Sequence, residues 1–156
     1  MADYAHSKSN SGFKQDQKRD ETPPIDVSKI TLKVINKDLF DCVAQNAAKS
    51  ISEAKKELNK PTQLRRFYDE IVMWDQKLTT VSDDKRRAEK FSEYLPFIKM
   101  LNAKVAYAKG RNLVDINFVQ LINHCLNQID SYQDLKYFKL FMEAFMGFYK
   151  EKRQKD

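Results

Sequence analysis

Glycine and proline are scarce in this chain of 156 residues, which contains three glycines and four prolines. Tight β-hairpins, glycine-rich phosphate loops and β folds with many turns all draw on these residue types. Neither a GxxxxGK nor a GxGxxG pattern occurs. The sequence therefore predicts an all-α fold without a nucleotide-binding loop.

Cysteines and long apolar runs are also few. Cys42 and Cys125 stand alone without a CxxC pair, and no apolar stretch approaches the length of a signal peptide or a bilayer crossing. We expect both cysteines to be reduced, buried thiols. We also expect a cytoplasmic protein without a membrane partner.

Groups that carry catalysis are sparse as well. The two histidines are His6 and His124, and the neighbouring His124 and Cys125 would point about 100° apart on a helix, which does not suit one metal ion. We predict no catalytic residues, no metal, no cofactor and no enzyme activity. One alternative stays open, a metal-dependent ribonuclease that uses carboxylates such as Asp69 and Asp75.

Composition divides the chain into two parts. Phe13 is the only large apolar residue between Ala5 and Pro23, so too little apolar surface is present to offset the entropy of ordering this stretch. We predict a disordered or extended polar tail over residues 1–30 and one helical bundle domain over residues 31–156. The segment 25–36 can be either extended or helical.

Apolar spacing within the second part predicts about five to six helices in a single compact bundle. We expect one helix from residue 38 to about residue 60, and a seam from Leu64 to Leu78 in the next. A helix from about residue 84 should be split by Pro96, and the following one should stop at a left-handed Gly110. Asp115 should cap the fifth helix, and an aromatic helix should run over 132–152.

Positive charge is concentrated in one stretch. The net charge is +6, while residues 1–30 contribute none of it and residues 85–111 contribute +6. Helical spacing in this stretch places a cation, an aromatic ring and a cation on one stripe, a pattern that suits a nucleic-acid backbone. The stripe consists of Phe97, Met100, Lys104, Tyr107 and Arg111. The alternative is a solvated face that favours the C-terminal end of the helix dipole.

Two blocks of sequence resemble a known family. Residues 62–71, TQLRRFYDEI, and residues 94–111, YLPFIKMLNAKVAYAKGR, are similar to the two most recognisable blocks of the small subunit of type III-A CRISPR-Cas effector complexes, the Csm small-subunit family. The resemblance covers roughly residues 35–150. It implies an all-helical, non-catalytic subunit of a ribonucleoprotein complex of antiviral defence.

The resemblance also implies partners and contact residues. Such subunits stack with neighbouring copies of themselves beside the backbone and large subunits, and contact the backbone of target RNA and the guide RNA–target duplex. Carried onto matching positions, the expected RNA-binding residues are Arg65, Arg66, Lys99, Lys104, Lys109 and Arg111. Tyr107 should pack beneath them. The remaining alternative is a helical protein–protein interaction subunit with an incidental basic face, which an exposed, Phe- and Met-rich last helix would favour.

Overall fold

The computed structural model describes residues 21–153, and these residues form helices and connecting loops without a β-strand. The elements are η1 (Leu39–Val43, a π-helical segment), α1 (Ala44–Ser52), α2 (Pro61–Thr79), α3 (Asp84–Lys99), α4 (Leu101–Gly110), α5 (Ile116–Leu126) and α6 (Tyr132–Lys152). The predicted all-α bundle is confirmed. The predicted disorder of residues 1–20 lies outside the described residues. In the described part of the chain, no helix combines the length and apolar character that a bilayer crossing requires.

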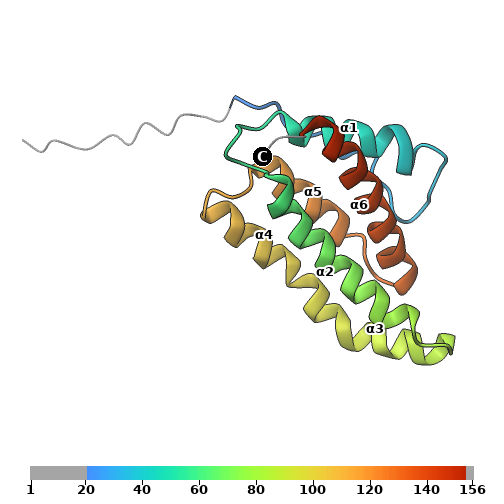
Figure 1. Cartoon of the computed structure of the whole chain (residues 1–156). Helices are drawn as coiled ribbons and strands as arrows, with labels where there is room; N and C mark the ends of the chain where they lie inside the picture. Colours follow the sequence, from blue (N-terminus) through green and yellow to red (C-terminus); the bar gives the residue numbers. More distant parts are fainter. Residues whose placement is uncertain (1–20, 154–156) are drawn as a thin grey trace, which may run out of the picture.

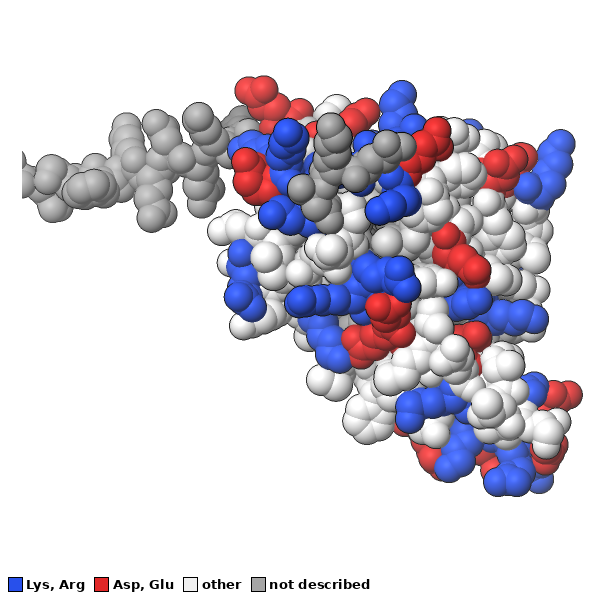
Figure 2. All heavy atoms as spheres, in the orientation of Figure 1, with Lys and Arg blue, Asp and Glu red and all other residues white. Residues whose placement is uncertain are grey.

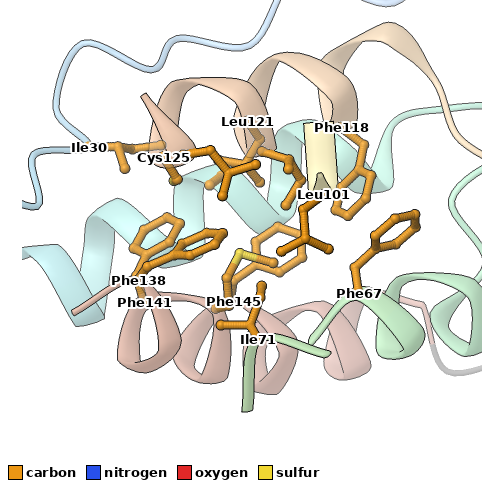
Figure 3. Close-up of a cluster of buried hydrophobic side chains, with 14 of the residues drawn as sticks. Ile30, Phe67, Ile71, Leu101, Phe118, Leu121, Cys125, Phe138, Phe141 and Phe145 are labelled. Carbon is orange, nitrogen blue, oxygen red and sulfur yellow. The ribbon is translucent and has the colours of Figure 1, made fainter. Parts of the chain in front are cut away.

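The helices pack around one hydrophobic core. In Figure 1, α6 lies against α1 and α2, and α3 and α4 form one long rod beside α2. Figure 3 shows aromatic rings from α2, α5 and α6 meeting in the centre, with the Phe67 and Phe118 centroids 5.5 Å apart. Each large apolar side chain buried there contributes about 1.5–3 kcal/mol. The aromatic residues of α6 that face this core are buried, so the last helix does not expose the apolar surface that would favour the protein-interaction alternative.

Residues 21–38, which we call the lead-in segment, run without helix along α5 and the start of α6. Ile25, Ile30 and Leu32 are buried in the core. The Leu32 backbone N–H donates to the Gln128 side chain at 2.8 Å. Residues 25–36, which the sequence left as either extended or helical, are therefore not helical. Ile25 and Ile30 precede residue 31, at which we predicted that the helical domain begins. That boundary stays a prediction.

Two ion pairs of Lys33 join the lead-in segment to the turn between α5 and α6 and to the start of α6. The Lys33 ammonium donates to Asp130 at 2.8 Å and to the buried Asp134 at 2.6 Å. Asp134 also forms a capping box with Ser131 at the start of α6. Burial acts to raise the pKa of Asp134, but hydrogen bonds from Lys33 and from the Asp130 backbone outweigh it and leave the pKa below its ordinary value.

Three expected helix ends are wrong, and the first two concern the α3–α4 rod and α1. The rod breaks at Met100 and not at Pro96, because α3 continues through Pro96 to Lys99 despite the backbone donor that proline removes. The Met100 N–H then bonds to Phe97 three residues back at 3.2 Å, which tightens the turn. The first helix stops at Ser52, well before residue 60.

The left-handed stop of α4 is Asn112, with φ 57°, and not Gly110. The Leu113 N–H bonds to the Ala108 carbonyl at 3.0 Å, and the Asn112 N–H bonds to the Lys109 carbonyl at 2.9 Å, which is a Schellman motif. Asparagine adopts the left-handed conformation more readily than most residues, because its short polar side chain can form local hydrogen bonds. The expected cap of α5 is confirmed, since Asp115 accepts from the Phe118 N–H at 2.9 Å.

Asn59 is a buried polar residue that joins three distant parts of the chain, and its φ is 55°. Its backbone N–H donates to Leu113 at 3.0 Å, and its side-chain amide donates to Ile51 at 3.2 Å. Its side-chain oxygen accepts from the Asp115 N–H at 2.9 Å, and its carbonyl accepts from the Tyr149 hydroxyl at 2.5 Å. Asn59 therefore connects the end of α1, the α4–α5 loop and α6.

We expect Asn59→Ala to lower the free energy of unfolding by about 3 kcal/mol. The change leaves the buried Asp115 N–H without its acceptor, removes one of the donors to the Ile51 carbonyl, and puts alanine in a left-handed conformation. Asn112→Ala is the matched control: it is also left-handed but exposed, and should cost about 1 kcal/mol. Urea unfolding measures both values. Equal losses would contradict the role of the Asn59 side chain.

We expect Asp134→Asn to destabilise the protein by about 1–2 kcal/mol at neutral pH. Because the folded state holds the pKa of Asp134 below its ordinary 3.8, the carboxylate stabilises the fold above that pH and loses this effect as the pH falls through the folded-state pKa. The gap between the two proteins should therefore shrink in acid. Unfolding curves at neutral and acidic pH test this, and a constant gap would contradict it.

Candidate nucleic-acid interface

Arg65 and Arg66 point to different sides of α2. Arg65 pairs with Asp69 on its own helix at 3.1 Å and lines a groove of about 500 Å³ between α2 and α6, together with Tyr68 and Lys150. Burial raises the pKa of Tyr68 in this groove. Arg66 is exposed and lies one turn before Glu70, on the edge of α2 that meets α4. The structure therefore separates the two neighbouring arginines.

Lys104 and Arg111 lie along the exposed edge of α4. The Lys104 ammonium bonds at 2.5 Å to Glu70 of α2, which runs antiparallel beside α4. The Arg111 guanidinium lies over the Tyr107 ring, 5.8 Å from its centroid. Tyr107 lies beneath Arg111 as expected, but at 68% exposure it is not packed into the fold and stays at the surface.

Lys99 and Lys109 do not share this edge. Each is five residues from Lys104, which corresponds to about 140° around the helix. The half-buried Lys99 ammonium donates to the carbonyl of Leu126 at the end of α5. Lys109 is exposed without an ion pair among the described residues. The structure thus brings together Arg66, Lys104 and Arg111, and places Arg65, Lys99 and Lys109 elsewhere.

The charge excess of residues 85–111 is likewise not one surface. The Arg87 guanidinium donates to the carbonyl of Leu78 in the last turn of α2 and to that of Val81 just after it, and it lies over the Tyr132 ring. Lys90 pairs with Glu93 at 3.3 Å. Part of the positive charge therefore satisfies helix ends and acidic neighbours, and a smaller part faces solvent.

An aromatic cluster missed by the sequence reasoning lies further along the same edge. Trp74 of α2 stands 5.3 Å from Tyr94 and 6.3 Å from Phe97, centroid to centroid, and the Phe97 ring is nearly parallel to it at 15°. The Lys77 ammonium lies 5.9 Å from the Trp74 ring centroid. The stripe that contains Phe97 was visible in the sequence, but its partner on another helix was not.

Together these residues form one surface between α2 and the α3–α4 rod, which we call the α2–α4 face. It comprises Arg66, Glu70, Met73, Trp74, Lys77, Phe97, Met100, Lys104, Tyr107 and Arg111. Figure 2 shows Lys and Arg atoms over this part of the molecule, with uncharged atoms exposed between them. Four of these residues are cations and one is a carboxylate, so the face can hold a polyanion and offers it aromatic rings.

The remaining candidate groups are the histidines and the cysteines. His124 hydrogen-bonds through Nε2 to the Ile30 carbonyl at 2.7 Å. Cys125 is buried, and burial raises the pKa of its thiol; Cys42 is exposed, so the expectation that both thiols are buried is wrong for Cys42. In residues 21–153, no three His, Cys, Asp or Glu side chains converge as a metal site requires. His6 lies outside the described residues.

Comparisons with known proteins give one family. The family model described as Csm2 Type III-A matches residues 36–155, which include η1 and α1 to α6. No curated protein and no solved structure gives a significant match. The matched range includes every residue of the α2–α4 face.

We expect Lys99→Met to lower the free energy of unfolding by about 1–2 kcal/mol, because it removes the ammonium that bonds to the Leu126 carbonyl at the end of α5. Lys109→Met removes the same charge from the next helix and should change stability by less than about 0.5 kcal/mol. Thermal and urea unfolding of both variants test this. Two variants of equal stability would contradict the structural role of Lys99.

Proposed function

Since the chain belongs to the Csm2 family, it is a structural small subunit of a type III-A CRISPR-Cas effector complex; we propose that it binds RNA there through the α2–α4 face. The observation that carries this proposal is the row of unburied cations and aromatic side chains along two adjacent helices. A row of this kind follows a phosphate backbone and needs no pocket.

Arg66, Lys104 and Arg111 supply the phosphate contacts. Arg66 and Arg111 are exposed, and the planar guanidinium group binds phosphate oxygens through two parallel hydrogen bonds. The Lys104 ammonium has three donors, of which the carboxylate of Glu70 occupies one. Glu70 therefore positions Lys104 and leaves donors for a phosphate.

Tyr107 lies between two of these cations and offers a ring to a sugar or base. The Arg111 guanidinium over the ring keeps both groups in place before RNA arrives. A preorganised pair loses less side-chain entropy on binding. This arrangement provides affinity without choosing a sequence, because no side chain on the face is set to read a base edge.

The subunit acts by binding, and we assign no reaction to it. Sequence choice rests with pairing between guide and target, so this protein follows the charge and shape of target RNA and of the guide–target duplex. Its other partners are the backbone and large subunits and neighbouring copies of itself. Many weak contacts along an assembled complex add up through linkage.

We expect the triple variant Arg66→Gln, Lys104→Gln and Arg111→Gln to weaken RNA binding and to reduce its salt dependence. Each lost contact to single-stranded RNA should flatten the slope of log affinity against log salt by about 0.7, or about 2 in all. Fluorescence anisotropy with labelled RNA measures this for the purified chain and for the assembled complex.

The matched control removes the same charge elsewhere, with Lys49→Gln, Lys56→Gln and Lys136→Gln at exposed positions. This control should keep the wild-type slope. If both triple variants change the slope equally, binding follows bulk charge and the α2–α4 face is not the site. An unchanged slope in the first variant rejects the face outright.

A further inference from the structure

Phe97 is an exposed ring held in a fixed orientation. It is 54% exposed, yet it stacks on Trp74, which in turn contacts Tyr94. A phenylalanine kept at the surface of a protein exposes apolar area to water at a cost of about 25 cal/mol per Å². The cluster below it prevents the ring from turning inwards, so a partner that covers the ring gains binding energy without ordering it first.

The neighbours of Phe97 enlarge this patch and set its charge. Met100 is 51% exposed and Met73 is 38% exposed. Lys77 lies at the Trp74 ring, and Lys104 follows Phe97 by seven residues, or about 10 Å along the rod. The Lys90–Glu93 pair at the far end of the patch carries no net charge. The patch is therefore apolar and aromatic, with cations at its borders.

We propose that this patch binds an unpaired nucleobase of RNA, which stacks on Phe97 while the adjoining phosphates contact Lys77 and Lys104. The inference rests on the proposed function, because it adds a base contact to the same phosphate-binding face. Cations at both borders of an aromatic patch complement a base flanked by two phosphates. The patch accepts any base, since every base has a π face and no hydrogen-bonding group is set to read its edge.

The site also explains why two aromatic positions occur on one line. Phe97 and Tyr107 are ten residues apart on the rod, about 15 Å, with Lys104 between them. One strand can follow this line and place an unpaired base at each ring. Phe97 differs from Tyr107 in its support, because Trp74 backs its ring while Tyr107 is flanked by Arg111.

The test uses the full chain and two single-stranded RNAs of equal length, one normal and one with abasic sites in place of its bases. Both carry the same phosphates. Trp74 is the only tryptophan in the chain, so its fluorescence reports directly on the patch. We expect normal RNA to bind about tenfold tighter than abasic RNA and to change the Trp74 emission, whereas abasic RNA leaves the emission unchanged.

Phe97→Leu keeps an apolar side chain and removes the stacking ring. It should weaken binding of normal RNA about tenfold and leave abasic RNA unaffected. Phe148→Leu, at a partly buried ring on α6, is the matched control and should leave the affinity for both RNAs unchanged. Circular dichroism checks that both variants are folded.

Each outcome decides one of the two proposals. If wild-type protein binds both RNAs equally and with the same salt dependence, the phosphate contacts stand and base stacking is rejected. If neither RNA binds, the proposed function fails and the stacking site fails with it. If Phe97→Leu leaves RNA binding intact but prevents assembly of the complex, the patch is a protein interface and the inference is overturned.

Discussion

The buried Asn59 side chain connects the start of one helix with the end of another, and the α2–α4 face depends on that connection. Asn59 lies two residues before α2, and its hydrogen-bond partners Leu113 and Asp115 follow α4. Buried polar groups must keep their partners, so this junction cannot shift without losing hydrogen bonds in the core. The junction therefore holds the first turns of α2, with Arg66, beside the last turns of α4, with Arg111.

Further contacts continue this alignment along the two helices. The Glu70–Lys104 ion pair lies beyond the Asn59 junction, and the stacked rings of Trp74 and Phe97 follow it. An exposed ion pair adds little to stability by itself. Its position next to a rigid aromatic cluster gives it another role, because it sets where the ammonium group stands relative to the exposed rings.

Many basic residues in this chain serve the fold and do not face a ligand. Lys99 and Arg87 donate to backbone carbonyls at the ends of α5 and α2. Arg153 donates to the carbonyl of Ser52, which ends α1, and to those of Ala54 and Leu58 beyond it. The last carbonyls of a helix lack partners further along the helix, and these cations supply donors to them. Net charge alone therefore overstates the surface available for RNA.

Apolar spacing predicted that the chain forms a helical bundle and that Phe97 to Arg111 lie on one stripe, because both depend on the regular rotation of a helix; it did not predict all of the helix ends. The family resemblance was also confirmed. The sequence did not indicate which of the neighbouring Arg65 and Arg66 meets α4. It also did not reveal the Trp74–Phe97 contact or the left-handed Asn59 and Asn112, since these depend on how separate segments pack.

The most direct test of RNA binding by the α2–α4 face is photo-crosslinking of target RNA to this subunit in the assembled complex, with crosslinked peptides identified by mass spectrometry. We predict crosslinks in the peptides that contain Arg66, Phe97 and residues 104–111, and crosslinks confined to the α2–α6 groove or to α1 would contradict the account.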